Sequence, residues 1–342
     1  MAELLSTVFT VVVGLAALLA VLLALYALTN VLPRVWREGA RVTLFLFPAL
    51  FALLIGLFVP ALRTIYLSFF DDAAKPKFIG FKNYQQIFAD RGTRLTVFNT
   101  LTWVIVGTIA TTIIALAIAR FADGMRGEKV AKSLVFIPAA ISLAGAGIIW
   151  RFVYASPPFK VGLLNQVTKV IPGLPDSMGG DGARNWILER GFGGFAPPKT
   201  APGFNTFLLI IIFIWAQAGI ATVIFSAAIK GVPESLIEAA KVDGATNKQV
   251  FYRVTLPYIR STIVTVATLT TIAGLKAFDI VASATGGNFG TSTIANDFYT
   301  ISFLQARFNF ASALAVLVFI LVIPVVIINR KAQRRAEEMM SG

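Results

Sequence analysis

Long apolar runs, separated by short polar segments, divide the chain into seven candidate membrane spans. A helix needs about 20 predominantly apolar residues to cross the hydrocarbon core, because only a helix or a closed barrel satisfies its own backbone hydrogen bonds there. The runs are continuous and lack the alternation typical of outer-membrane strands. The pattern therefore predicts an all-α, polytopic membrane bundle. Its spans are expected at residues 7–32, 42–66, 97–119, 133–155, 206–228, 261–282 and 310–329.

The first apolar run has the position of a signal peptide but not its pattern. Glu3 is the only early charge, and no charged residue occurs from residue 4 to residue 33. A signal peptide has a basic start and a shorter apolar stretch, so we expect this run to be retained as a span.

Composition narrows the chemistry that the chain can perform. Of its 342 residues, 57% are hydrophobic and 14% are charged, against roughly a quarter charged in soluble domains. The sequence has no Cys and no His, which excludes disulfides, thiol nucleophiles and the side chain best suited to proton transfer at neutral pH. No span carries paired carboxylates, so an intramembrane enzyme would lack acid–base groups. We expect no catalytic residue and no metal site.

The distribution of basic residues predicts the orientation in the membrane. The chain has 30 Lys and Arg against 17 Asp and Glu, an excess that could suit nucleic acid but on so apolar a chain favours an anionic membrane face. The loops at 33–41, 120–132, 229–260 and 330–342 hold 16 basic residues in 67 positions, whereas the remaining loops hold 11 in 113. Because basic residues stay on the cytoplasmic side, we expect the N-terminus outside and the C-terminal tail inside.

We expect three parts: an extra N-terminal helix with a cytoplasmic linker (1–41), a transmembrane domain (42–329) and a basic cytoplasmic tail (330–342). The largest outer loop, 156–205, is interrupted by many Pro and Gly residues, which break regular structure. Short helices are expected in it near residues 161–170 and 184–189.

A polar segment at residues 229–260, on the predicted cytoplasmic face, has the signals of two short helices. Pro233 suits a first helical position, and Gly244 can close that helix in a left-handed conformation. Thr246 and Gln249 have the spacing of a capping box for the second helix.

The same segment offers a surface for a partner. Leu256 and Pro257 are expected to end the second helix where the chain returns to the membrane. On the first helix, the small side chains of Ala239 and Ala240 allow close seating in a groove, and Glu238 is available to a cationic group.

These residues also carry a family resemblance. The order Glu238-Ala239-Ala240, three residues, Gly244, nine residues, Val254, one residue, Leu256-Pro257 resembles the EAA loop of ABC-importer permeases. Val254 stands where that pattern has Ile. The resemblance implies that the loop docks into an ATPase subunit and transmits its motion, and it assigns this coupling role to Glu238, Ala239, Ala240, Asp243, Gly244, Leu256 and Pro257.

The resemblance extends from about residue 42 to residue 329. The segments 45–49, 67–69, 80–84, 276–281 and 285–287 look like those of maltose-type carbohydrate permeases. The segments 131–138, 149–154 and 162–165, with the extra N-terminal span, are most similar to alpha-glucoside permeases. The resemblance implies a type I importer permease fold in a bacterial inner membrane.

The resemblance also implies partners. The sequence has no G-x-x-x-x-G-K-[ST] phosphate loop, so two separate ATP-binding subunits would bind ATP and Mg²⁺, and this chain would hold no cofactor. A second homologous permease and an extracellular solute-binding protein complete such an importer, which works by alternating access. Maltose, trehalose, sucrose and related alpha-glucosides remain open as substrates, as does a solute such as glycerol phosphate.

Polar residues within spans are costly and are candidates for the translocation path. By their distance from the EAA loop, Gln217, Thr270 and Gly274 match positions near sugar in maltose-type permeases. A sugar could stack on Trp215 and bond to the Gln217 amide. The alternatives are structural: a Thr hydroxyl bonding its own helix, a Gly at a close helix contact, or a Gln bridging helices.

Two charges lie near the outer end of one predicted span. Lys276 and Asp279 have the i, i+3 spacing of one helical face, which predicts an internal salt bridge. An ion-coupled secondary transporter could also use such a pair, but the sequence shows no internal repeat of the kind those carriers have.

Overall fold

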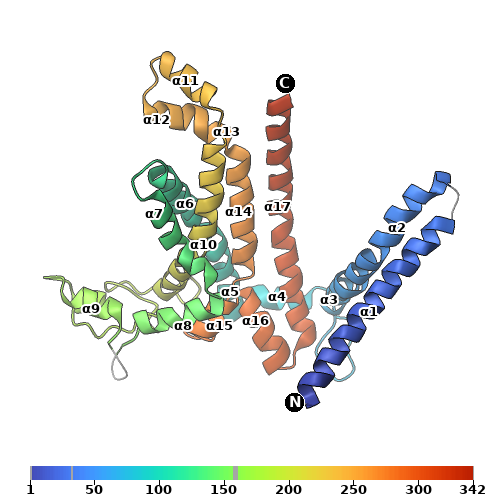
Figure 1. Ribbon diagram of the computed structural model, residues 1–342. Helices are drawn as coiled ribbons and strands as arrows, with labels where there is room; N and C mark the ends of the chain where they lie inside the picture. The colour runs from blue at the N-terminus through green and yellow to red at the C-terminus, as the bar shows by residue number, and fades with distance from the viewer. Residues whose placement is uncertain (1, 32–33, 157–160, 342) are drawn as a thin grey trace. The chain divides into compact units, whose positions relative to one another are not determined.

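The computed structural model describes residues 2–31, 34–156 and 161–341, and it divides into two compact units, Met1–Tyr66 and Leu67–Gly342 (Figure 1). Helices form the framework of both units, as the apolar pattern predicts. The shorter elements of the second unit are α4 (Lys82–Ala89), α9 (Leu163–Lys169), η4 (Asp176–Met178), α15 (Asp279–Ala284), α16 (Ile294–Tyr299) and η6 (Thr300–Leu304).

The first unit is a pair of long helices. Helix α1 (Ala2–Val31) covers the first predicted span as far as residue 31, and residue 32 lies outside the described residues. The second helix runs through α2 (Arg34–Leu53), a π-helical turn η1 (Leu54–Phe58) and α3 (Val59–Leu67). It is helical from Arg34, so most of the predicted linker 33–41 belongs to the helix.

Four helices in the described part of the chain are long and apolar enough to cross a membrane, or up to six spans if two bent helix pairs each count as one. The four are Val42–Leu67, Arg91–Ala122, Phe204–Lys230 and Phe308–Lys331. The second of these joins α5 (Arg91–Thr102), the π segment η2 (Trp103–Gly107) and α6 (Thr108–Ala122). The last lies within α17 (Phe308–Ser341).

The predicted span at 133–155 is not one continuous helix. The chain forms α7 (Glu128–Phe136) and the short 3₁₀ turn η3 (Ile137–Ala140), then bends by 103° into α8 (Leu143–Val153). Pro138 lies in the 3₁₀ turn, and the Ser142 hydroxyl caps the new helix by accepting the Gly145 N–H at 3.1 Å. An apolar run reports composition over some 20 residues and does not detect a break of two.

The predicted span at 261–282 is also shorter than expected. Helix α14 (Arg260–Leu275) ends before residue 276, and α15 starts anew at Asp279. The first residues of α14 meet the preceding helical segment, Asn247–Tyr258, at a 67° bend.

Helix α10 (Phe204–Lys230) is the centre of the second unit. More than half of the residues in its most apolar stretch are buried. A helix that is apolar all round belongs in a core. It packs against α6, α7, α8 and α14. Leu209, Ile212 and Phe213 of α10 are almost wholly buried, in a cluster with side chains of η2, α8 and α15.

The loop 161–203 contains one of the two short helices that the sequence predicts. Helix α9 forms at Leu163–Lys169, within the first expected helix. The second region, 184–189, is a turn and not a helix. It is organised by Arg184, which is 6% exposed and lies 5.3 Å from the Trp186 ring and 5.2 Å from the Phe192 ring.

Candidate functional site: a helical hairpin and a cavity between two helices

The polar segment 229–260 forms a helical hairpin at one end of the second unit, beyond the ends of α10 and α14 (Figure 1). Its first helix, α11 (Glu234–Val242), starts one residue later than expected, because Pro233 is the N-cap and not the first helical residue. Pro233 lacks an N–H, so its place before the helix leaves no donor unsatisfied.

Gly244 ends α11 as predicted. Its φ is +83°, a left-handed conformation that glycine adopts without a Cβ penalty. The Ala245 N–H donates to the Ala240 carbonyl at 2.9 Å, and the Gly244 N–H donates to the Lys241 carbonyl at 3.0 Å. These two bonds form a Schellman motif, which satisfies carbonyls at the helix end.

The predicted capping box is also confirmed. The Gln249 N–H donates to the Thr246 hydroxyl at 3.3 Å, and the Thr246 N–H donates to the Gln249 side chain at 2.8 Å. The second helix of the hairpin then runs through α12 (Asn247–Val250), the π segment η5 (Phe251–Thr255) and α13 (Leu256–Tyr258). Leu256 and Pro257 therefore lie within its last turn. The helix ends at Tyr258, one residue after the Leu256-Pro257 pair that was expected to end it.

Helix α11 presents its residues to the outside of the unit: none of them is buried. Val242 is 88% exposed, and Glu238 and Ala239 are also exposed, as is Asp243 just after the helix. Within the described residues no ion pair involves Glu238. The hairpin is thus held rigidly by its own caps, while a narrow surface of small side chains and one free carboxylate is available to a partner.

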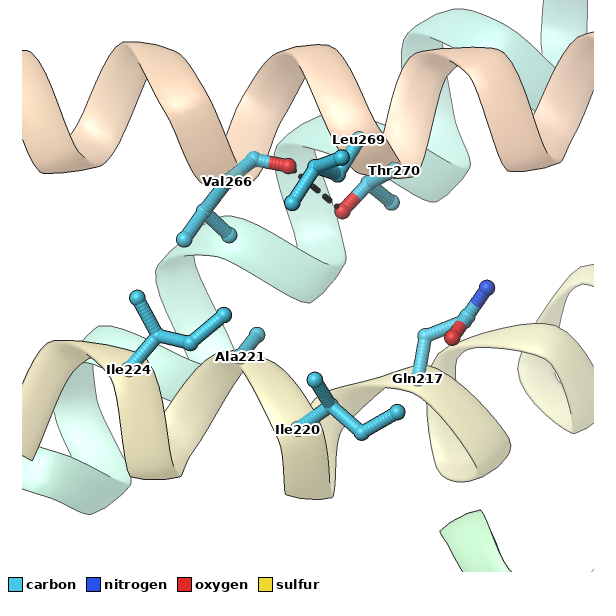
Figure 2. A pocket seen from close by; sticks show the side chains of 7 residues that line it. All are labelled: Gln217, Ile220, Ala221, Ile224, Val266, Leu269 and Thr270. Carbon is cyan, nitrogen blue, oxygen red and sulfur yellow. Dashed lines mark hydrogen bonds between the residues drawn. The ribbon is translucent and has the colours of Figure 1, made fainter. Parts of the chain in front are cut away.

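A cavity of about 180 Å³ lies between α10 and α14, at the middle of both helices. Figure 2 shows the Gln217 amide extending from α10 toward α14, with Thr270 on the opposite wall. Ile220, Ala221, Ile224, Val266 and Leu269 complete the lining. The structure therefore brings two of the three predicted path residues together in one apolar cavity.

These two side chains differ in their hydrogen bonding. The Thr270 hydroxyl donates to the Val266 carbonyl of its own helix at 2.9 Å, which is the structural alternative that the sequence left open. Gln217 makes no hydrogen bond within the described part of the chain. It is the side chain of this cavity with donors and acceptors to offer.

The third predicted residue, Gly274, lies elsewhere. A Cβ at Gly274 would be 3.4–3.6 Å from the backbone of Trp103 and Val104, so Gly274 lies where α14 packs against the π segment η2. Trp215 is also absent from the cavity lining; its ring packs on Trp150, with 5.7 Å between centroids. Residues two apart on a helix point to different faces, so a sugar cannot stack on Trp215 while bonding to Gln217.

The predicted Lys276–Asp279 salt bridge is wrong. Lys276 follows the last residue of α14 and Asp279 begins α15, so the two do not share a helical face. Both are exposed, and no ion pair joins them. The described residues also contain no group of three acidic side chains that could hold a metal ion.

Trp103 is a buried residue with a polar group that lies outside the predicted site. It is fully buried in the π segment, its ring lies 5.6 Å from that of Phe213, and its indole N–H has no partner within the described chain. The sequence gives no signal of this, because a tryptophan in an apolar run is typical of ordinary packing.

Residues 126–338 match the model of a protein family described as "binding-protein-dependent transport system inner membrane component". This segment contains the whole hairpin, the cavity and both bent helix pairs.

Two relatives align with most of the chain. The osmoprotective compounds uptake permease GgtC of Synechocystis is 39% identical over 295 residues, covering 85% of this chain and 98% of its own length. The alpha-glucoside transport permease AglF of Rhizobium meliloti is 36% identical over 304 residues, covering 87% and 84%.

The fold has a counterpart of known structure. A chain from the crystal structure of a bacterial ABC transporter that imports the acidic polysaccharide alginate superposes with a TM-score of 0.70. The match covers 89% of this chain and 99% of that chain at 22% identity. The likeness confirms the type I importer permease fold that the sequence resemblance implies.

Proposed function

This chain belongs to the family of inner-membrane components of binding-protein-dependent transport systems, and from that premise we propose that it forms part of the translocation path of an ATP-driven sugar importer. A second permease chain completes the path. Two ATP-binding subunits, which hold ATP and Mg²⁺, dock on the inner side, and a solute-binding protein delivers sugar on the outer side. The N-terminus then lies outside and the tail after residue 329 inside.

The exposed face of α11 is the observation that carries this proposal. A helix that buries none of its own residues, yet is closed at its C-terminal end by a left-handed glycine and followed by a second helix with a capping box, has the form of a docking element. Its Glu238-Ala239-Ala240 surface suits a groove that contains a cation. No phosphate loop occurs in the sequence, so the energy for transport comes from the partner that fills this role.

The geometry supports alternating access. The hairpin connects directly to α10 and α14, the two helices that line the cavity. Closure of the ATP-binding subunits moves the hairpin, and the two helices change their positions relative to the rest of the bundle. The cavity alternates in this way between the two sides of the membrane.

The substrate class we propose is alpha-glucosides of the maltose, trehalose or sucrose type. Support comes from the 36% identity to a permease named for alpha-glucoside transport and the 26% identity to the trehalose/maltose permease MalF of Thermococcus litoralis. The 39% identity to a permease for osmoprotective compounds makes such compounds the second candidate. Gln217 offers an amide donor and acceptor to the hydroxyl groups of a sugar.

Reconstitution tests the proposed function. The chain, its partner permease and the ATP-binding subunits are placed in liposomes, and uptake of labelled maltose, trehalose and sucrose is measured with the binding protein outside. We expect uptake that requires ATP inside and is unaffected when ion gradients are collapsed. Uptake by this chain alone, driven by an ion gradient, would instead establish a secondary transporter.

We expect Gln217→Ala to raise the sugar concentration needed for half-maximal uptake by about two- to tenfold, because a hydrogen bond is worth about 0.5–1.5 kcal/mol. Assembly with the ATP-binding subunits should be unchanged, since Gln217 bonds to nothing else in the described chain. The matched control is Thr270→Val in the same cavity, whose hydroxyl is already bonded to Val266. Unchanged uptake of every sugar by Gln217→Ala would remove it from the path.

A further inference from the structure

A cluster of four charged side chains and one hydroxyl joins three segments at the inner end of the second unit. We call it the Lys132 cluster; its members are Asp123, Glu128, Lys132, Ser226 and Lys230. Asp123 follows α6, Glu128 and Lys132 lie on α7, and Ser226 and Lys230 lie on the last turns of α10. The contact between Lys132 and Ser226 joins residues 94 positions apart in the sequence.

Lys132 uses its three donors on three segments. Its ammonium donates to the Asp123 carboxylate, to the Ser226 hydroxyl and, at 2.7 Å, to Glu128 Oε1. The Ser226 hydroxyl in turn donates to Asp123 at 2.8 Å, and Lys230 forms an ion pair with Glu128. An ammonium group has three protons, so these three partners use all the donors of Lys132.

Burial indicates what the cluster is for. The side chains of Lys132, Asp123 and Glu128 keep 16%, 13% and 22% of their exposure, against 55% for Lys230. Withdrawing charges from water costs free energy that their attraction only partly returns, so such clusters are weak sources of stability. They do hold the segments that bear them in one relative position.

The cluster lies where the coupling hairpin begins. Lys230 is the last residue of α10, and three residues separate it from the first residue of α11. Any movement of α11 is therefore delivered first to the end of α10 that the Lys132 cluster attaches to α7.

A second contact ties α7 to α10 further along. Gly219 lies against the backbone of α7 so closely that a Cβ there would be 2.5 Å from the Val135 carbonyl oxygen and 2.8 Å from Phe136 Cα. With two attachments on one face, α7 follows α10.

The bent pair carries this attachment to the opposite end of the unit. After the 103° bend, α8 crosses α15, with Gly147 against Ser283 and the Ile280 carbonyl. Figure 1 shows α8 and α15 at the end of the unit far from α11 and α12. One path from the hairpin to this end thus runs through α7, η3 and α8, with the Lys132 cluster as its first joint, beside the direct packing of α10 on α8.

We propose that the Lys132 cluster is the joint through which displacement of the coupling hairpin moves α7 and, through it, α8 and α15. Lys132 is a positioning residue in this account and touches no substrate. The inference rests on the proposed function, since it specifies how one part of the importer follows the ATP-binding subunits.

The test measures uptake and ATP hydrolysis together in the full importer in liposomes. Lys132→Met removes the ammonium but keeps the chain length. We expect hydrolysis and binding of the ATP-binding subunits to stay within about twofold, while sugar moved per ATP falls about tenfold, within the usual range of coupling between sites. Lys129→Met is the control, because Lys129 lies on the same helix, is exposed and belongs to no ion pair within the described residues.

A second variant distinguishes loss of the joint from misfolding of the chain. Lys132→Met alone leaves Asp123 with only the Lys230 ammonium, at 4.0 Å, as a cationic partner, and one oxygen of that carboxylate already lacks a partner within the described chain. Lys132→Met combined with Asp123→Asn removes both charges, so it should fold and show the same lower ratio.

The outcomes separate the two hypotheses. A ratio equal to that of Lys129→Met, or a parallel loss of uptake and hydrolysis, overturns the role of the cluster. Absence of ATP-dependent uptake in the unaltered importer overturns the proposed function instead. Since the sequence has no Cys, single cysteines at Lys248 and Ile149 can carry spin labels. Their separation should change little on ATP binding in the unaltered importer, because α8 follows the hairpin, and should change clearly in the variant that combines Lys132→Met with Asp123→Asn.

Discussion

Glu238→Lys is expected to abolish sugar uptake while leaving the chain folded and inserted in the membrane. Glu238 is exposed on α11, and no described residue forms an ion pair with it. Folding therefore does not depend on its charge. In the proposed complex the carboxylate meets a cationic group of the ATP-binding subunit, and a lysine places two like charges in a desolvated contact. Disrupting such a pair costs about 2–5 kcal/mol, which is more than tenfold in affinity.

Two measurements check this result. Pull-down of the ATP-binding subunits and uptake of labelled sugar should both fail for Glu238→Lys, and Glu238→Gln should fall between it and the unaltered chain. Lys248→Glu, an exposed charge reversal in the second helix of the same hairpin, serves as the control and should retain the complex. Normal uptake by Glu238→Lys would show that α11 does not couple this chain to its energy source.

Gly219→Val is expected to lower the stability of the second unit strongly. The first added carbon meets the Val135 carbonyl oxygen at 2.5 Å and Phe136 Cα at 2.8 Å. Both atoms belong to the backbone, so no side chain can turn away, and α7 and α10 must separate. Overpacking a core typically costs about 1–3 kcal/mol, and a rigid backbone neighbour puts this site at or above the upper end. Valine also gains little as a helix former at this position.

Thermal unfolding of the detergent-solubilised chain measures the effect. The midpoint should fall clearly for Gly219→Val. Gly231→Ala is the matched control, because a Cβ there would be 3.4–3.5 Å from its nearest neighbours, which is ordinary contact. Equal midpoints for the two variants would mean that α7 and α10 are not closely packed at Gly219.

The hairpin at residues 229–260 could be predicted almost residue by residue, because the interactions that form it are local. The left-handed glycine after α11 and the Thr246–Gln249 capping box each depend on residues within a few positions of one another. The errors were also small. Pro233 is the N-cap of α11 and not its first residue, and the second helix continues to Tyr258, one residue beyond Pro257. Short-range hydrogen bonds are written in the order of the residues, so the sequence is sufficient to find them.

The candidate path was predicted only in part. Choosing polar residues in apolar runs found Gln217 and Thr270, which share the cavity. The same reasoning included Gly274 and paired Gln217 with Trp215, and the structure separates both from the cavity. Polarity identifies an expensive residue, but helical register and the neighbouring helix decide which way it points.

The amino-acid sequence by itself determined that this chain is a helical membrane protein, which family it belongs to and which segment forms the hairpin at residues 229–260, because hydropathy and short motifs are properties of contiguous residues. Tertiary structure alone decided that the span near residue 140 turns by 103°, that Lys276 and Asp279 do not pair, and that Lys132 joins α7 to the base of the hairpin. The bend near residue 140 and the separation of Lys276 from Asp279 depend on how neighbouring helices pack against the backbone where it turns. The Lys132 contact depends on two helices lying side by side, and from the sequence Lys132 counted only as one more positive charge on the inner face.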